Sequence, residues 1–234
     1  MADLVILTPT RGRPVRFAEL AAAVADTAEL DVALVGYVDD DDPDREVYEA
    51  MAGGQVHIAV GPRRSLAGWT NTGAHAAIHS GARYLASLGD DHLPRTRGWD
   101  RLLIDAVEEL PGPGIAYGND LFQGPRLPTA WVVAAELVRA VGWMMLPGCE
   151  HMYVDTAVLA LGQAADRIVY RPDVVIEHRH PLAGKAGWDA SYRESNAESR
   201  YAADRIAFDA WRTGGGLDAD AATVQALTRL EPAK

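Results

Sequence analysis

The stretch that decides the fold is Leu88-Gly89-Asp90-Asp91-His92-Leu93-Pro94, which begins at the end of the apolar run 83–88. A short apolar run that ends in polar residues is typical of a buried strand that leads into a loop. In open α/β sheets, ligands bind at the carboxyl ends of the strands, where such loops gather. Two adjacent carboxylates at this place suit a divalent cation that joins the protein to a substrate phosphate. Aspartates that simply cap a turn are the alternative.

Further strands and helices alternate on both sides of this stretch. The other predicted strands are residues 4–7, 32–38, 56–60, 115–117, 129–135, 167–170 and 174–177. Apolar residues at helical spacing predict helices at residues 17–24, 66–77, 99–110, 136–141, 154–163 and 197–211. Strands that alternate with helices indicate a mainly parallel sheet with helices on both faces. The glycines 214–216 separate a last segment, 217–230, which we expect to be a loosely attached helix.

The composition limits the class of protein. A chain of 234 residues is long enough for one sizeable α/β domain. Its net charge of −11 argues against a broad basic face for nucleic acid. Cys149 is its single cysteine, so it has no internal disulfide, which suits a reducing compartment. The sequence shows no signal-peptide pattern and no apolar run of about 18 residues, so we expect a cytoplasmic protein without a membrane span.

Polar residues also follow three of the earlier predicted strands. They are Thr8-Pro9-Thr10-Arg11 after the first strand, the aspartate run 39–42 after the second, and Arg63-Arg64 after the third. Because the carboxyl ends of parallel strands meet at one edge of a sheet, we expect these loops to converge with Asp90 and Asp91. Arginines and metal-binding carboxylates together suit a diphosphate with its metal.

Two later groups of residues add candidate chemistry. His178 and His180 leave the strand 174–177 on the same side, where either offers a nitrogen to a metal, or both are structural histidines. Asp155 begins the helix 154–163, where a carboxylate serves as a general base or as a helix cap. Asn71 either faces the site or caps a helix.

Taken in order, these motifs resemble the GT-A nucleotide-sugar transferases, especially the family 2-like group. The resemblance covers about the first 180 residues and rests on the loop 8–14, Asp39, the segment 63–73, and the acidic pair followed by Pro94 and Gly98-Trp99. It implies a GT-A (Rossmann-like) α/β fold with a C-terminal helical tail. Residues 1–212 would form one domain, with a nucleotide-sugar half (1–120) and an acceptor half (121–212). Residues 213–234 would be a flexible tail or helix.

The resemblance also implies an activity and roles for individual residues. The activity is metal-dependent transfer of a sugar, from a UDP- or GDP-linked donor to an acceptor hydroxyl. With a single base and no second carboxylate as nucleophile, we expect inversion at the anomeric carbon. By the same resemblance, Asp91 and His178 bind Mn²⁺ or Mg²⁺, and Asp155 is the catalytic base, with Glu150 as its competitor. The implied donor-binding residues are Thr8, Pro9, Thr10, Arg11, Asp39, Arg63, Asn71 and Asp90.

The match to the family has departures, and other functions remain open. Gly89 stands where many relatives carry the first acid of the motif, and His92 follows the acidic pair in place of an acid. A metal-dependent phosphoesterase is one alternative, because Gly89-Asp90 and His178-Arg179-His180 resemble pieces of the calcineurin-like enzymes. A non-catalytic nucleotide-binding GT-A domain is another. The acceptor is unknown, and the acidic balance makes a nucleic-acid acceptor the less favoured one.

Overall fold

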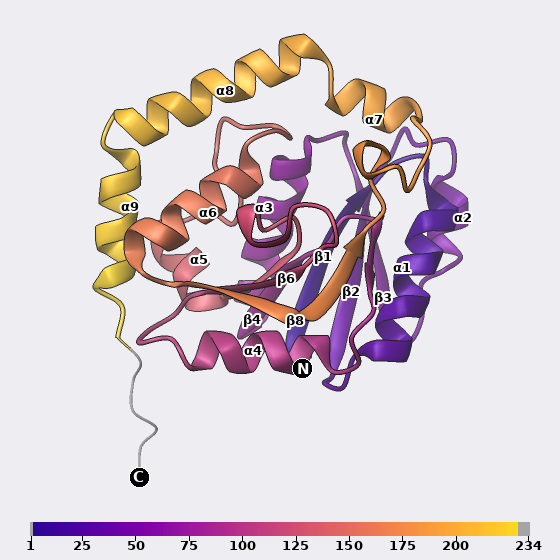
Figure 1. The fold of residues 1–234 in the computed structure, drawn as a ribbon. Coiled ribbons are helices and arrows are strands. Elements are labelled where there is room, and N and C mark those ends of the chain that lie inside the picture. The colour runs from indigo at the N-terminus through magenta and orange to yellow at the C-terminus, as the bar shows by residue number, and fades with distance from the viewer. Residues whose placement is uncertain (1, 229–234) are drawn as a thin grey trace.

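The apolar runs of the sequence form one sheet, drawn in Figure 1. The computed structural model describes residues 2–228. Within these residues, the strands are β1 (Leu4–Thr10), β2 (Val32–Asp39), β3 (Val56–Gly61), β4 (Tyr84–Ser87), β5 (His92–Pro94), β6 (Ile115–Asn119), β7 (Trp131–Ala134) and β8 (Ile168–His178). Their order across the sheet is β3-β2-β1-β4-β7-β6-β8-β5. The pairs β3–β2, β2–β1, β1–β4 and β6–β8 are parallel, which confirms the mainly parallel prediction.

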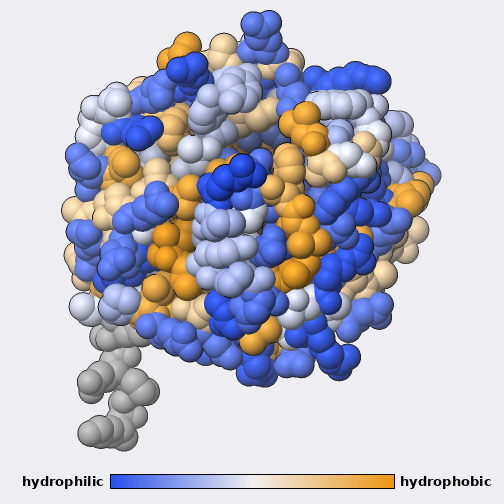
Figure 2. All heavy atoms as spheres, viewed as in Figure 1, coloured by the Kyte–Doolittle hydropathy of each residue, from blue (hydrophilic) through white to orange (hydrophobic). Residues whose placement is uncertain are grey.

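Helices cover both faces of this sheet, as predicted. They are α1 (Pro14–Thr27), α2 (Arg45–Glu49), α3 (Leu66–His79), α4 (Trp99–Glu108), α5 (Ala135–Val141), α6 (Val154–Ala165), α7 (Ala190–Ser195), α8 (Glu198–Thr213) and α9 (Gly216–Gln225). The alternation along β1 explains the two layers, because Leu4 and Ile6 pack with α1 and α4 while Leu7 packs with α3, α5 and α6. The face seen in Figure 2 mixes hydrophilic and hydrophobic side chains, as protein surfaces usually do.

Strand β1 is longer than predicted. It continues through Thr8, Pro9 and Thr10, which we expected in a loop. Strand β4 pairs with β1 only over Leu4–Leu7. Thr8, Pro9 and Thr10 therefore pair with β2 alone among the described strands. A proline is tolerated where a strand has an unpaired side. The polar end of β1 therefore lies beside the end of β2, with which it is paired.

Residues 167–170 and 174–177, predicted as two strands, are one continuous strand, β8. The polar stretch 171–173 interrupts the apolar pattern, but the backbone remains extended there and bulges against β6. The partner of Gly118 is Arg171, whereas that of Asn119 is Val175. A side chain at Gly118 would lie 2.4 Å from the carbonyl oxygen of Val174, so the bulge requires glycine there. A bulge of this kind has no signature in the apolar spacing.

Residues 92–94, which we expected in a loop, form the short strand β5. It leaves the loop after β4 and pairs antiparallel with β8 at the edge of the sheet. His92 lies directly opposite His178, and Pro94 opposite Ile176. This pairing brings the acidic motif to the end of β8.

The C-terminal segment is a docked helix. Asp220 of α9 accepts hydrogen bonds from the indole nitrogens of Trp143 and Trp211, at 3.2 and 2.9 Å, and Val224 is fully buried. Helix α8 runs past α6 along the top of the view in Figure 1. The last residues of the helix predicted at 217–230 lie outside the described part of the chain. Within residues 2–228, every helix is too short or too polar to cross a membrane.

Candidate active site

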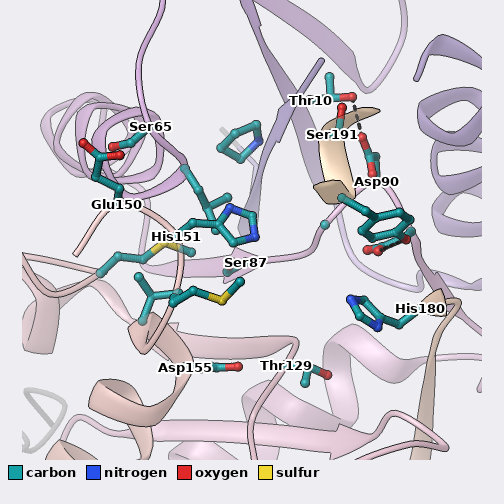
Figure 3. A pocket seen from close by; sticks show the side chains of 18 of the residues that line it. Thr10, Ser65, Ser87, Asp90, Thr129, Glu150, His151, Asp155, His180 and Ser191 are labelled. Carbon is teal, nitrogen blue, oxygen red and sulfur yellow. Dashed lines mark hydrogen bonds between the residues drawn. The ribbon is translucent and has the colours of Figure 1, made fainter. Parts of the chain in front are cut away.

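A cavity of about 640 Å³ opens at the carboxyl ends of the parallel strands (Figure 3). Residues from the ends of β1, β2 and β4 line it, among them Arg11, Asp39 and Asp90, together with Arg63 from the loop after β3. The predicted convergence of these strand ends is therefore confirmed. The other walls come from the loops before β7 and α6 and from residues after β8.

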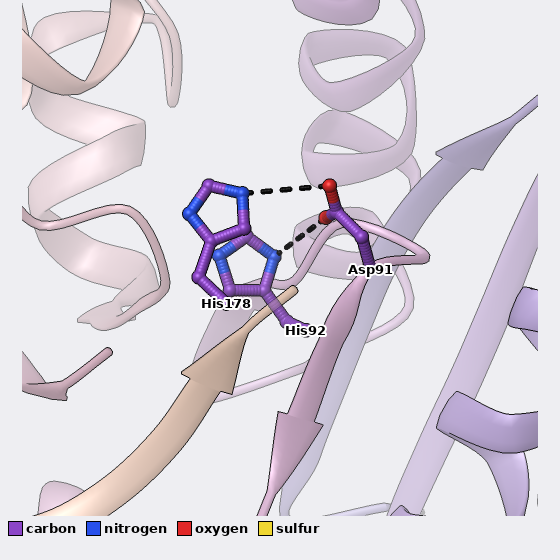
Figure 4. A group of neighbouring side chains, drawn as sticks. All are labelled: Asp91, His92 and His178. Atoms are coloured by element: carbon purple, nitrogen blue, oxygen red, sulfur yellow. Dashed lines mark ion pairs between the residues drawn. The ribbon is translucent and has the colours of Figure 1, made fainter. Parts of the chain in front are cut away.

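Asp91, His92 and His178 form a compact cluster at one side of the cavity (Figure 4). The rings of His92 and His178 stack with centroids 4.2 Å apart, because the two residues are direct cross-strand partners on β5 and β8. Asp91 Oδ1 lies 3.2 Å from His92 Nδ1, and its Oδ2 lies 3.4 Å from His178 Nε2. Each residue offers one potential ligand atom, and the three atoms lie within 4.8 Å of one another.

The electrostatics of this cluster keep Asp91 ionised. Burial alone would raise the pKa of Asp91, but the two histidines outweigh it and hold the pKa well below its usual range. Burial opposes protonation of His178 as well, yet the charges of Asp120 and Asp91 raise its pKa to about 9. For His92, burial and the neighbouring His178 lower the pKa. A carboxylate with two imidazoles is a ligand set that first-row divalent ions accept.

Two ring nitrogens of the cluster have no hydrogen-bond partner among the described residues. They are His92 Nε2 and His178 Nδ1, and both are buried. Asp120 Oδ2 lies 3.8 Å from His178 Nδ1, which is beyond hydrogen-bond distance. Buried polar atoms normally find a partner, so such orphans call for an explanation. The nitrogens that face Asp91 are the other two, His92 Nδ1 and His178 Nε2, and a carboxylate with two imidazoles within 4.8 Å of one another is a donor set that fits a divalent metal.

Gly89 packs closely against the cluster. Its N–H donates to His92 Nδ1 at 3.0 Å. A β-carbon on Gly89 would lie 2.8 Å from Asp91 Oδ1 and 3.0 Å from His92 Nδ1. The first acid of the family motif would fit here only if the side chains of Asp91 and His92 moved.

Asp90 faces away from the cluster toward the end of β1. Its carboxylate accepts hydrogen bonds from Thr10 Oγ1 at 2.7 Å and from Arg13 at 3.1 Å. Burial raises the pKa of Asp90 to about 6, although Arg13 acts in the opposite direction. Neighbouring aspartates thus have different environments, one among histidines and one against an arginine.

Asp39 ends β2 and is nearly buried. It accepts hydrogen bonds from the indole nitrogen of Trp69 at 2.8 Å, the backbone N–H of Arg64 at 3.2 Å and the guanidinium of Arg11 at 3.0 Å. These bonds tie the ends of β1, β2 and β3 together at the cavity wall. Arg63, in the same loop, pairs with Glu194 of α7.

Two of the predicted donor-binding residues do not line the cavity. The buried hydroxyl of Thr8 donates to the carbonyl oxygen of Leu88 at 2.8 Å, which ties β1 to the end of β4. The amide of Asn71 bonds the backbone of Met144 and Met145 through three hydrogen bonds of 2.8–2.9 Å. Both side chains hold walls of the site in place, and direct donor binding by them has no support in the structure.

Asp155 and Glu150, the two candidate bases, differ in environment. Asp155 lies in the first turn of α6 and its carboxylate lines the cavity (Figure 3). Burial raises its pKa, and its Oδ1 accepts the N–H of Thr156 at 2.7 Å. The Glu150 side chain is 59% exposed and lies 3.5 Å from Arg200. A base needs a raised pKa inside the cavity, so the geometry favours Asp155.

Comparisons with solved structures give the fold a name. A mannosyltransferase from Pyrobaculum calidifontis, in complex with GDP-Man and Mn²⁺, matches 95% of this chain and 79% of its own, with a TM-score of 0.59 and 14% identity. A glucosyl-3-phosphoglycerate synthase from Mycobacterium tuberculosis, in complex with Mn²⁺, UDP and glucosyl-3-phosphoglycerate, matches 91% and 80%, with a TM-score of 0.62 and 12% identity. The chain has a GT-A fold. No protein-family model and no curated protein matches it by sequence.

The GT-A fold also places residues in the site that sequence reasoning missed. His92 completes the cluster, and its signal was its place directly after the acidic pair. Tyr192 of α7 donates its hydroxyl to Asp91 Oδ2 at 2.6 Å, and Asp189 pairs with Arg13 at 2.7 Å. His151 points into the cavity (Figure 3), and burial lowers its pKa to about 4. Tyr192, Asp189 and His151 lie outside the motifs of the sequence analysis, so no local pattern marks them.

Proposed function

We propose that the protein transfers a sugar from a nucleoside-diphosphate sugar to an acceptor hydroxyl in a metal-dependent reaction. The Asp91–His92–His178 cluster carries the proposal, since it stands in one cavity with the arginine-bearing ends of β1 and β3 and with Asp155. The neighbours that share the fold support it, because their structures contain GDP-Man with Mn²⁺ and UDP with Mn²⁺. The phosphoesterase alternative rested on short peptide motifs and has no such support.

The cluster and the nearby arginines would receive the diphosphate. Asp91, His92 and His178 would hold Mn²⁺ or Mg²⁺, which would neutralise the leaving diphosphate as the glycosidic bond breaks. Arg13 lies 3.1 Å from Asp90 and adds a fixed positive charge beside the cluster. Asp39, with Arg11 and the loop after β3, would form the nucleoside end of the site.

Asp155 would activate the acceptor. Its raised pKa lets the carboxylate take a proton from the attacking hydroxyl as the new bond forms. Direct attack by the acceptor hydroxyl on the anomeric carbon, assisted by this single base, would invert the configuration. The acceptor half of the cavity would be built by the loops before β7 and α6.

Donor binding and hydrolysis test the proposal. Thermal unfolding is followed with UDP-glucose and with GDP-mannose, each with and without Mn²⁺. We expect one donor to raise the Tm only in the presence of Mn²⁺, since a bound ligand stabilises the folded state by mass action. We also expect slow release of sugar from that donor.

Asp91→Ala should abolish both the Mn²⁺-dependent stabilisation and the hydrolysis. Asp105→Ala, a change at an exposed aspartate of α4, is the matched control and should leave both intact. Failure of every donor to bind the wild-type protein would reject the proposal. Binding without hydrolysis or transfer to any acceptor would favour the non-catalytic nucleotide-binding domain instead.

A further inference from the structure

Helix α8 reaches back to the loop that precedes Asp155. Asp204 of α8 is 1% exposed. Its Oδ1 accepts the backbone N–H of Glu150 at 2.8 Å, and its Oδ2 accepts those of His151 at 2.9 Å and Met152 at 2.7 Å. One buried carboxylate from the C-terminal part of the chain thus binds three successive backbone donors of a cavity wall.

The backbone directly after this loop is held in an unusual conformation. Tyr153 has φ +63° and ψ 0°, in the left-handed region that bulky residues rarely adopt. Its ring packs between two rings of α8, with centroids 5.2 Å from Tyr201 and 5.3 Å from Phe208. A strained residue persists only where its surroundings hold it, and such residues gather at functional sites.

These two sets of contacts together determine where Asp155 lies. Tyr153 is the residue from which α6 starts, so its left-handed turn sets the direction in which the helix leaves the loop. Asp155 follows two residues later, in the first turn, and His151 lies inside the clamped segment. Both side chains line the cavity.

We infer that Asp204 is a positioning residue for the sugar-transfer reaction: through its three hydrogen bonds, α8 holds the loop 150–153 so that Asp155 and His151 face the acceptor side of the cavity. This inference rests on the proposed function. Asp204 is separated from Asp155 by a loop and acts on it only through the backbone. Its loss therefore affects turnover and leaves the donor end of the site, formed by β1, β2 and β4, as it is.

The test compares Asp204→Asn with Asp209→Asn. An asparagine retains one acceptor oxygen, but its NH₂ group faces N–H donors of the loop, so the clamp is broken with almost no change in size. Asp209 lies on the same helix, its side chain is 55% exposed, and it pairs only with Arg205 among the ion pairs of the described residues. It reports on a charge change in α8 that leaves the clamp intact.

The first measurement is Mn²⁺-dependent hydrolysis of the donor that binds, UDP-glucose or GDP-mannose. We expect kcat to fall by about 10–100-fold in Asp204→Asn, because small misplacements of a reacting group have effects of this order. The donor KM and the affinity for UDP or GDP with Mn²⁺ should change by no more than about twofold. Asp209→Asn should match the wild type. An unchanged kcat in Asp204→Asn overturns the inference, as does a loss of donor affinity as large as the loss of kcat.

Hydrogen exchange provides the second measurement and does not depend on turnover. The amides of Glu150, His151 and Met152 should exchange faster in Asp204→Asn than in the wild type or Asp209→Asn, since they lose their acceptor. Unchanged protection of these amides overturns the clamp itself. If the wild-type protein binds no donor, the proposed function fails, and the exchange result separates that failure from failure of the clamp.

Discussion

The two sides of the cavity, the Asp91–His92–His178 cluster and the loop 150–153 before the proposed base Asp155 (the base loop), are built in different ways. The cluster takes its geometry from strand register, since His92 and His178 are direct partners on β5 and β8 and Asp91 immediately precedes β5. The base loop has no strand to hold it. Helix α8, about 50 residues further along the chain, holds it through Asp204 and two aromatic rings, and the N–H of Ala67 in α3 donates to the carbonyl oxygen of Glu150 at 3.1 Å.

The difference shows how one cavity combines two kinds of rigidity. Strand pairing fixes backbone and side-chain direction together, so a cluster on paired strands is preorganised by the sheet. A loop at a helix start needs partners for its backbone N–H groups, and here a distant carboxylate supplies them. Local motifs therefore mark Asp91 and His178 on the first side, whereas the contacts that hold the second side are visible only in the folded structure.

The largest effect is expected for the proposed base, Asp155, and it tests the side of the cavity that the base loop builds. Asp155→Asn should lower kcat for donor hydrolysis and transfer by about 10²–10⁴-fold, the usual contribution of a general base. Glu150→Gln is the matched change at the competing carboxylate. It should lower kcat by less than about threefold, since that side chain is exposed beside Arg200. Steady-state kinetics with saturating donor and Mn²⁺ measure both. The reverse ranking would make Glu150 the base.

The next largest effect concerns the Asp91–His92–His178 cluster. It tells whether two or three of these residues bind the metal. His92→Ala and His178→Ala should each weaken Mn²⁺ binding by at least about 10–100-fold, the loss that follows even from removing a residue that only orients a metal ligand. Electron paramagnetic resonance of free Mn²⁺ measures the affinity. His79→Ala, at an exposed position of α3, serves as the control. Wild-type affinity in His92→Ala would return the ligand set to Asp91 and His178.

The smallest effect is a pH dependence. Burial raises the pKa of Asp155 above 3.8, against the opposing hydrogen bonds of Thr156. A base acts only when ionised, so kcat should fall as the pH drops through this raised pKa, with an acid limb above pH 3.8. Asp90, with a pKa of about 6, titrates in a neighbouring range. The limb belongs to Asp155 if it disappears from the residual rate of Asp155→Asn.

Local patterns predicted the parts of the molecule that depend on neighbours in sequence. The apolar run before Gly89 predicted β4 and the loop after it, and the alternation of strands and helices predicted the parallel sheet. Parallel strands place their carboxyl ends together, so the meeting of Arg11, Asp39 and Asp90 at one cavity followed from topology alone.

Contacts between distant parts of the chain were not predictable in the same way. The partnership of His92 with His178 depends on the register of β5 against β8, and the chain gives no sign that residues 92–94 form a strand at all. Asp204 looks like any polar residue of an amphipathic helix, because its partners are backbone groups that carry no sequence signal. Asn71 was predicted to bind the donor because its segment resembles the family, whereas its amide is engaged by Met144 and Met145.

Strand β5 has a consequence for the durability of the protein. It has three residues, forms one edge of the sheet and, among the described strands, pairs with β8 alone. An exposed sheet edge is a site where chains aggregate by pairing their strands, and a short edge strand detaches easily. An ion bound by His92 on β5 and His178 on β8 would cross-link these two strands. Removal of the metal by a chelator would then free β5 and expose the edge of β8 as well as stop the reaction. The protein would lose activity and aggregate on storage, and the aggregation would be seen as turbidity.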